Sequence, residues 1–183
     1  KAEGLNLTKY RGKGRDVWLA LGIANLRSYA VALHDADIQG YNEMIPTKLL
    51  YPLLEPELDF KFNKGYYARV NIKRKVMFVR VFRLFLQPLL RSLVDLLGSE
   101  QDFVRFMRSF RYPISGEFAL TSDLARDLDI PGGWGIEVGV MAEIYRNVAT
   151  KRICQTDLGF YEHKHQKVGD SEKGLVKMSG EIF

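Results

Sequence analysis

Cysteine is almost absent from this chain of 183 residues, since Cys154 is the single example. One thiol cannot form an internal disulfide, so nothing points to an oxidising compartment and we expect a cytoplasmic protein. Long apolar runs are also missing, because the richest stretch, 81–97, is interrupted by Arg83, Arg91 and Asp95. No segment reaches the roughly 20 apolar residues that span a bilayer, and the first residues lack the apolar core of a signal peptide. We therefore expect no membrane-spanning segment.

Apolar residues make up 46% of the sequence, which suffices for a sizeable core and excludes a disordered tail. The 27 lysines and arginines exceed the 22 aspartates and glutamates, so the formal charge is +5 and the isoelectric point is near 9.3. This sign suits phosphates, nucleotides or an anionic membrane surface without choosing among them. No repeat, low-complexity tract or long linker divides the sequence, so we expect one domain over 1–183.

Helical and strand-like patterns alternate along the chain, which predicts an α/β fold. Apolar residues at helical spacing predict helices over 14–26, 45–54, 81–97, 100–110, 122–128 and 136–148. Apolar or alternating runs predict strands over 29–33, 58–70, 117–120 and 152–158. The first of these strands has the pattern of a buried parallel strand that ends in a polar loop. Pro88 should kink its helix or start a new one, and Gly65 is expected to mark a bulge.

Two aspartates, Asp35 and Asp37, follow that apolar strand with one small residue between them. This spacing can aim two carboxylates at one divalent cation, and hard oxygen ligands suit Mg²⁺ or Mn²⁺ bridged to a diphosphate. A solvated turn would have the same pattern. The residues alone leave both interpretations open.

The three histidines are too few to complete a zinc site without carboxylates, and Cys154 offers no thiolate cluster, so a structural zinc site is not expected. His163 and His165 lie two residues apart just after a predicted strand. In an extended segment both imidazoles would point the same way, toward a metal or a phosphate. The alternative is a surface turn that contains them by chance.

Segments that contain glycine supply three further candidates. Lys13 lies between two glycines before a helix, so its ammonium and the nearby backbone amides are suited to a diphosphate; a flexible basic loop is the alternative. Glu137 lies at the start of a helix, where it either complements the helix dipole or faces a reacting sugar. The turn at Ser115, Gly116 and Glu117 either offers backbone amides and a carboxylate to a ligand that approaches closely at Gly116, or is a plain turn.

Basic residues strongly outnumber acidic ones between Lys61 and Arg111. A small acidic substrate, nucleic acid or a membrane face would each explain this excess. Aromatic residues such as Tyr66 and Phe78 interleave with the charges, as in nucleic-acid binders, but in α/β domains such rings usually belong to the core. Nucleic acid is therefore not the expected partner.

Five segments taken together resemble the glucosyl-3-phosphoglycerate synthases and the related mannosyl-3-phosphoglycerate synthases. Their order and spacing carry the resemblance, and they are Arg11-Gly12-Lys13-Gly14, Ala32-Leu33-His34-Asp35-Ala36-Asp37, Tyr112-Pro113-Ile114-Ser115-Gly116-Glu117-Phe118, Gly133-Trp134-Gly135-Ile136-Glu137-Val138-Gly139 and Tyr161-Glu162-His163-Lys164-His165-Gln166. The resemblance implies a type A glycosyltransferase fold, a Rossmann-like α/β sandwich that binds a nucleotide sugar. Relatives begin with strand-helix units that bind the base and ribose, whereas this sequence begins almost at the lysine loop. We therefore expect a domain that lacks its N-terminal part.

The resemblance also implies roles on the donor side of the site. Asp37 would be the principal metal ligand, and His163 would complete the protein side of the metal site. Asp35 would support this site or contact the donor ribose. Lys13 would hold the donor diphosphate and Glu137 would lie near the transferred sugar, which makes these two the expected catalytic residues.

The remaining implied roles concern placement of the substrates. The backbone around Gly116 and Glu117 would help to place donor or acceptor. A Gly-Arg-Val-Thr stretch binds the acceptor in the family, and Val79-Arg80-Val81-Phe82 occupies the matching place in this sequence. Arg80 is retained and is the expected acceptor ligand together with His165, whereas the glycine and the hydroxyl of the family motif are replaced.

The implied reaction is transfer of glucose from a nucleotide sugar, UDP-glucose in the leading hypothesis, to 3-phosphoglycerate, with retention by same-face attack and Mg²⁺ or Mn²⁺ as cofactor. One alternative is a mannosyl-3-phosphoglycerate synthase that uses GDP-mannose. The other is a non-catalytic module that binds phosphate or nucleotide. The resemblance also implies a homodimer, with these small molecules rather than nucleic acid or a membrane as partners.

Overall fold

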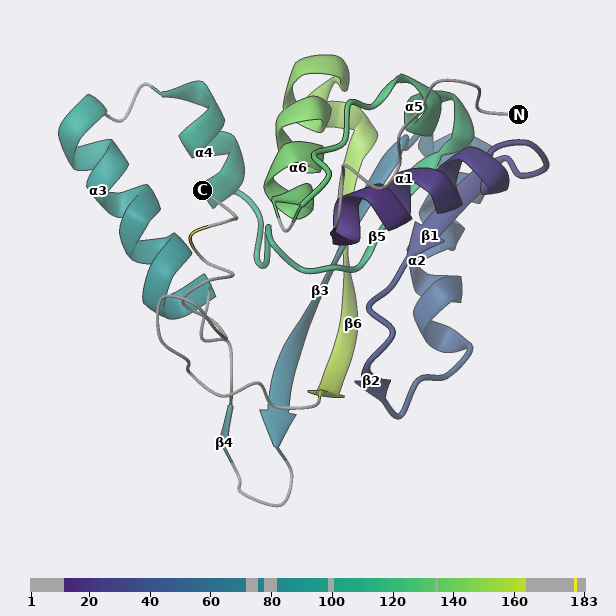
Figure 1. Ribbon diagram of the computed structural model, residues 1–183, viewed down its shortest axis with the longest axis horizontal. Coiled ribbons are helices and arrows are strands. Elements are labelled where there is room, and N and C mark those ends of the chain that lie inside the picture. Colours follow the sequence, from purple (N-terminus) through teal and green to yellow (C-terminus); the bar gives the residue numbers. More distant parts are fainter. Residues whose placement is uncertain are drawn as a thin grey trace.

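The computed structural model describes residues 12–71, 76–77, 82–98, 101–133, 135–163 and 180. At its centre is a mixed sheet whose strands follow the order β1-β5-β3-β6-β2, with β4 paired to β3 (Figure 1). The strands are β1 Ala30–Leu33, β2 Ile38–Gln39, β3 Phe62–Asn71, β4 Val76–Met77, β5 Phe118–Thr121 and β6 Ile153–His163. β3 and β6 run parallel as the long central pair, and the other pairs are antiparallel.

Each helix that the apolar spacing predicts is present, with ends that differ by a few residues. The helices are α1 Lys13–Ala24, α2 Met44–Leu54, α3 Gln87–Leu97, α4 Asp102–Arg108, α5 Ser122–Asp127 and α6 Ile136–Asn147, with short helical turns η1 Pro56–Leu58, η2 Phe82–Leu86 and η3 Thr150–Arg152. Pro88 lies in the first turn of α3, where its missing N–H costs no hydrogen bond, so it starts a new helix after the π-helical turn η2. No helix in the described part of the chain is long and apolar enough to cross a membrane.

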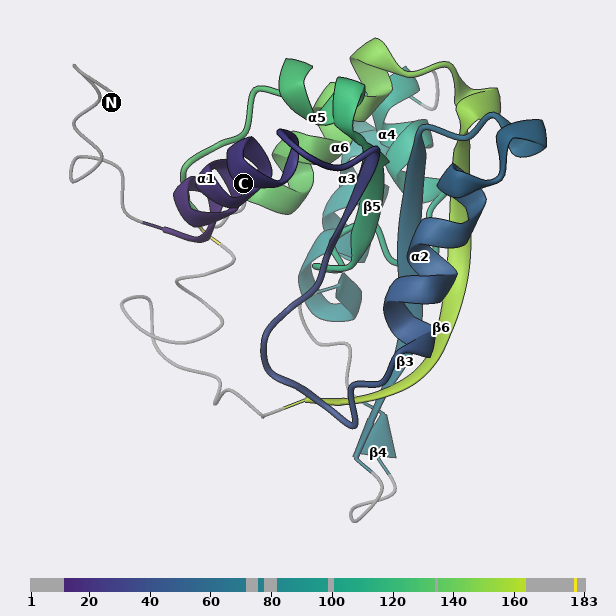
Figure 2. The same cartoon turned by 90° about the vertical axis from the view of Figure 1, so that its right-hand side faces the viewer.

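Helices cover both faces of the sheet because successive strand residues point to opposite sides. Phe118 of β5 belongs to the same core as Val17 and Leu21 of α1, and the neighbouring Ala119 belongs to a second core with Leu49 of α2. Figure 2 shows α1 and α2 on opposite sides of β5. The result is a three-layer α/β/α sandwich.

Two local predictions differ from the structure. The sequence pattern predicts a buried parallel strand at 29–33, but β1 pairs antiparallel with β5 at one end of the described sheet, and its residues are only partly buried. The expected bulge is not at Gly65, because the irregular register with β6 falls between Tyr66 and Ala68. Gly65 instead permits close packing, since a Cβ there would lie 2.6 Å from Leu158 Cδ1.

Candidate active site

Three side chains from distant parts of the sequence meet where β1 ends. The Nζ atom of Lys13, the first residue of α1, lies 2.6 Å from Asp35 Oδ1 and 2.7 Å from Glu137 Oε1. Asp35 follows β1, and Glu137 lies in the first turn of α6. All three side chains are largely buried, with Glu137 only 12% exposed. The sequence predicts each residue as functional, and the structure adds that they form one ion-pair cluster.

Glycines bring α1 into this position. A Cβ on Gly14 would lie 1.7 Å from the carbonyl oxygen of Pro131, so only glycine lets α1 begin against the loop before α6. The backbone N–H groups of Gly14 and Arg15 donate to the carbonyls of Gly133 and Gly132, each at 3.2 Å. The glycine pattern predicts amides available to a diphosphate, but the loop occupies these two. The ammonium of Lys13 is therefore the part of this segment that is suited to bind phosphate.

Lys13 is held in its charged form. Burial lowers the pKa of Lys13, but the charges and hydrogen bonds of Glu137 and Asp35 outweigh burial and raise it above the ordinary value of 10.5. A cation next to two carboxylates is thus fixed in place before any substrate binds, which is the preorganisation that charge stabilisation requires.

The turn that contains Gly116 forms the wall beside Asp35. A Cβ on Gly116 would lie 2.5 Å from Asp35 Oδ1, so the backbone approaches this carboxylate closely. The next residue, Glu117, is fully buried. Burial and the charge of Asp35 raise the pKa of Glu117 from 4.5 to about 7. Its side chain therefore lies in the interior, within electrostatic reach of Asp35.

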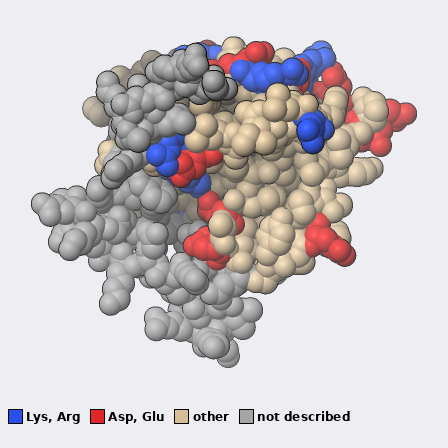
Figure 3. All heavy atoms as spheres, turned by 45° about the vertical axis from the view of Figure 1, so that its right-hand side comes forward, with Lys and Arg blue, Asp and Glu red and all other residues tan. Residues whose placement is uncertain are grey.

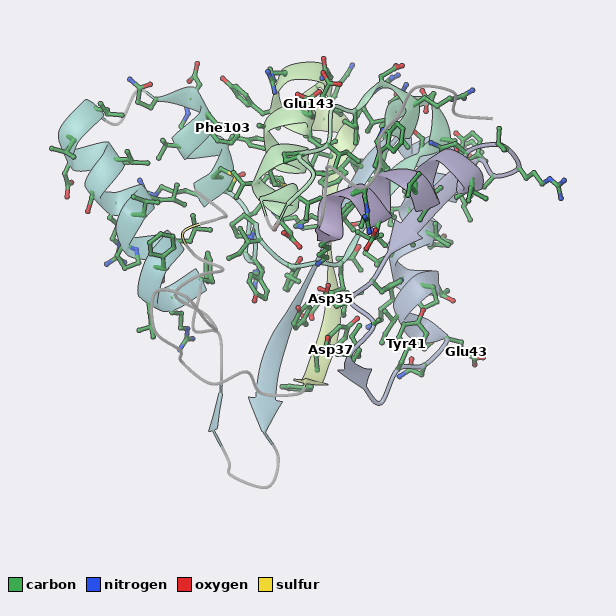
Figure 4. The ribbon with its side chains drawn as sticks, viewed as in Figure 1. Asp35, Asp37, Tyr41, Glu43, Phe103 and Glu143 are labelled. Carbon is green, nitrogen blue, oxygen red and sulfur yellow. The ribbon has the colours of Figure 1, made fainter. Side chains whose placement is uncertain are left out.

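Asp37 lies at the open side of the site, below α1 and next to Asp35 (Figure 4). Its side chain is exposed, unlike that of Asp35. The antiparallel pairing of β2 with β6 sets Ile38 opposite His163, the last residue of β6. Directly paired residues have Cα atoms about 5 Å apart, and Asp37 is the residue before Ile38. The backbone positions of Asp37 and His163 are therefore close together, a placement compatible with a shared divalent ion. No group of three or more histidine, cysteine or acidic side chains suited to a metal occurs among the residues described.

The acceptor residues predicted from the resemblance, Arg80 and His165, lie outside the described residues. His34, the third histidine, packs edge-on against Tyr41 with ring centroids 5.5 Å apart. Burial lowers the pKa of His34 from 6.5, although the charge of Asp35 acts in the opposite direction. A neutral imidazole in this place supports the loop between β1 and β2 by packing.

Lys64 is a residue next to the site that sequence reasoning missed. It lies on β3 with 1% of its surface exposed, and its Nζ donates to the carbonyl oxygen of Ser115 at 2.6 Å. In the sequence it is only one of many basic residues. A signal is present nonetheless, because Lys64 follows Phe62 by two residues on a strand and therefore shares the face of a core residue.

A cavity of about 530 Å³ opens near the end of the sheet at which β2 pairs with β6. It lies between the start of α2 and the end of β6, and its lining includes Glu43, Lys48 and Phe160. The Lys48 ammonium donates to the backbone carbonyl of Asp157 at 3.1 Å, which ties α2 to β6 at this point.

Solved structures are similar to this fold, although no protein-family model matches the chain. Glucosyl-3-phosphoglycerate synthase from Mycobacterium tuberculosis is 26% identical with a TM-score of 0.69, over 94% of this chain and 52% of that one. Mannosyl-3-phosphoglycerate synthase from Rubrobacter xylanophilus is 27% identical with a TM-score of 0.72, over 92% of this chain and 47% of that one. The fold is that of the type A glycosyltransferases, as the sequence predicts.

Sequence comparison narrows this class to one family. Glucosyl-3-phosphoglycerate synthase from Methanococcoides burtonii is 55% identical over 184 aligned residues, which are 100% of this chain and 45% of that protein. The chain belongs to the glucosyl-3-phosphoglycerate synthase family, and it spans about half the length of the relatives it matches. Crystal structures of the M. tuberculosis protein contain Mn²⁺ with UDP-glucose and phosphoglyceric acid, or Mg²⁺ with UDP.

Proposed function

We propose that this chain carries the catalytic part of an enzyme that transfers glucose from UDP-glucose to 3-phosphoglycerate with retention of configuration. The observation that carries this proposal is the cluster in which Lys13 is held by Asp35 and Glu137 beside the backbone of Gly116. The 55% identity to a glucosyl-3-phosphoglycerate synthase over the whole chain supports the choice of reaction.

The charges of the site favour a divalent cation and a diphosphate together. Asp35, Asp37 and Glu137 contribute three carboxylates, whereas Lys13 contributes one ammonium, so the site has surplus negative charge. Asp37 and His163 are the residues that would hold the ion. A bound Mg²⁺ or Mn²⁺ would supply charge stabilisation for the leaving diphosphate.

Lys13 and Glu137 would act at the bond that breaks. The bond between the glucose anomeric carbon and the UDP oxygen breaks, a bond from that carbon to the acceptor hydroxyl forms on the same face, and the hydroxyl proton passes to the departing phosphate oxygen. Lys13 would stabilise the negative charge that grows on this oxygen. Glu137 would orient Lys13 and lie beside the sugar.

Acceptor binding is assigned to Arg80 and His165 by the family resemblance. The acceptor carries a phosphate and a carboxylate, and a guanidinium binds either group with paired hydrogen bonds. Val79 and Phe82 replace the glycine and threonine of the family motif, so we expect Arg80 to carry more of the acceptor affinity than it does in relatives.

Transfer of mannose from GDP-mannose is the second candidate, because the fold is as similar to a mannosyl-3-phosphoglycerate synthase, with a TM-score of 0.72, as to the glucosyl enzyme. The third is a module that binds nucleotide without turnover.

A homodimer and a cytoplasmic location remain predictions. Light scattering on the purified chain tests whether it is a homodimer.

Release of nucleoside diphosphate tests the proposed function. The 183-residue chain, of verified mass, is incubated with Mg²⁺ and either UDP-glucose or GDP-mannose, with and without 3-phosphoglycerate. We expect UDP release that requires the acceptor, and a product whose anomeric proton coupling matches that of the donor. Release of GDP from GDP-mannose, with no release of UDP from UDP-glucose, would support the mannosyl alternative. Nucleotide binding without release of either diphosphate would support the non-catalytic module.

A further inference from the structure

Lys64 has surroundings that are unusual for a lysine. It is among the largest fully buried side chains, although lysine is seldom buried without a specific partner. Its Nζ donates to the Ser115 carbonyl oxygen at 2.6 Å and lies 5.2 Å from the centre of the Phe118 ring. Burial lowers the pKa of Lys64 to about 8, while the carboxylates of Glu137 and Glu117 act in the opposite direction. The ammonium therefore lies against the turn that contains Gly116, next to the candidate site.

Lys64 is one part of a clamp between β3 and the turn at 115–117. The Ser115 hydroxyl donates to the carbonyl of Gly65 at 2.6 Å, and the N–H of Gly65 donates to the carbonyl of Glu117 at 2.9 Å. A Cβ on Gly65 would lie 3.1 Å from atoms of Glu117, so the turn packs directly on the strand. The turn is thus tied to β3 before and after Gly116. Of these hydrogen bonds, the one from the Lys64 ammonium to the Ser115 carbonyl is charge-assisted.

The position of Gly116 determines where the Asp35 carboxylate can lie. The Asp35 oxygens would be 2.5 and 2.7 Å from a Cβ on Gly116, so a small outward shift of the turn would release Asp35 and an inward shift would displace it. Asp35 in turn fixes the Lys13 ammonium at 2.6 Å. A continuous set of contacts therefore joins Lys64 to Lys13 through one backbone turn.

We propose that Lys64 is a positioning residue: by holding the Ser115 carbonyl it fixes the turn at Gly116 and thereby orients the Asp35 carboxylate that pairs with Lys13. The hydrogen bond of Lys64 goes to the backbone of the turn, and its charge also acts directly on Asp35 and Glu137. Ser115→Ala leaves that charge in place, so this variant isolates the influence that passes through the backbone. The effect of Lys64 on the donor side of the reaction rests on the proposed function, whereas its effect on the geometry of the cluster does not.

Three variants separate this role from a general contribution to stability. Lys64→Met keeps an unbranched side chain of nearly the same length and removes the ammonium. Ser115→Ala removes the hydrogen bond to Gly65 on the same clamp and leaves Lys64 intact, so it tests the clamp even if the first variant folds poorly. Lys48→Met is the matched control, because Lys48 also donates to a backbone carbonyl but is exposed and lies on α2.

The first readout is independent of activity. Nitrogen-15 NMR of the lysine ammonium groups and backbone amides follows Lys13 and Gly116 in each folded variant. We expect both signals to shift in Lys64→Met and in Ser115→Ala and to stay unchanged in Lys48→Met. Lys13 and Gly116 signals that match those of the parent protein in folded Lys64→Met would overturn the proposal.

The second readout is steady-state kinetics with both substrates varied. We expect Lys64→Met to lower kcat/KM for the sugar donor by about 10–100-fold, the range seen when a group that orients a catalytic side chain is removed, with the acceptor KM unchanged. Equal loss for donor and acceptor would contradict a role on the donor side. If the parent protein releases no nucleotide from any donor, the proposed function fails while the NMR result still decides the role of Lys64.

Discussion

At the scale of single residues, the site separates buried groups that set geometry from exposed groups that face the solvent. Lys13, Asp35 and Glu137 satisfy one another in a largely buried cluster, whereas Asp37 is exposed. A substitution at Asp37 should therefore change binding without changing the fold. This difference makes Asp37 the clearest position at which to test the metal assignment.

We expect Asp37→Asn to lower the affinity for Mn²⁺ by at least about tenfold and to abolish metal-dependent turnover, because the substitution removes one of the anionic oxygen ligands that hard cations require. The free energy of unfolding should stay within about 0.5 kcal/mol of the parent, as for other exposed positions. Electron paramagnetic resonance titration with Mn²⁺ measures the affinity, and Asp127→Asn, at an exposed position on α5, is the control. Unchanged Mn²⁺ affinity in Asp37→Asn would remove Asp37 from the metal site.

Glu117 should make the stability of the fold depend on pH. Its pKa is raised from 4.5 to about 7, first by burial and then by the charge of Asp35. Between these values the folded state keeps a proton that the unfolded state has lost, so the contribution of Glu117 to stability is fully present below pH 4.5 and is lost as the pH rises through 7. The loss attributable to Glu117 is about 3 kcal/mol by this relation.

Glu117→Gln should remove this part of the pH dependence, because a neutral amide has no proton to lose. Urea unfolding of both proteins at about pH 5 and about pH 7 measures the difference. We expect the free energy of unfolding to fall more steeply over this interval in the parent than in Glu117→Gln. Parallel profiles would mean that Glu117 ionises normally in the folded protein.

At the scale of the elements, the contact between α1 and the loop before α6 decides whether the cluster forms. Gly14 and Gly139 both pack against Pro131, and a Cβ at Gly139 would lie 2.3 Å from its ring. We expect Gly14→Ala to destabilise the fold by roughly 1–3 kcal/mol, because the added methyl group forces α1 away from this loop.

Gly22 provides a control on the same helix. A Cβ there meets nothing within 4 Å, so Gly22→Ala should stabilise α1 by about 0.5–1 kcal/mol through helix propensity alone. Urea unfolding of both variants measures the two changes in the free energy of unfolding, which we expect to have opposite signs. Similar effects at Gly14 and Gly22 would indicate that helix propensity, and not the contact with Pro131, determines the outcome.

The helices were predictable from the sequence, whereas the pairing of the strands was not. Helix positions were predictable because apolar spacing is a local signal, and the family motifs named Lys13, Asp35 and Glu137. The antiparallel pairing of β1 was missed because strand order depends on contacts between distant segments. Lys64 was missed because most lysines are exposed, and only its register on β3 distinguishes it from the other basic residues.

At the scale of the whole molecule, one side of the described structure is unusually apolar. α1 and the turn that follows it expose Ile23 at 73%, Leu26 at 80% and Tyr29 at 68%. Figure 3 shows a broad surface on this side that is neither acidic nor basic. β1, at the end of the described sheet, lies next to this face with its residues partly exposed. Large exposed apolar surfaces and unpaired strand edges both promote association.

We therefore expect the 183-residue chain to self-associate with increasing concentration, and the double variant Ile23→Lys, Leu26→Lys to shift this equilibrium toward monomer by at least about tenfold. Leu96→Lys, Leu97→Lys adds the same charge at exposed positions on α3 and is the matched control. Sedimentation velocity over a range of concentrations measures each equilibrium. An equal shift in both double variants would assign the effect to net charge, and a shift confined to the first would locate the associating surface at α1, because only there do the added lysines interrupt the apolar face.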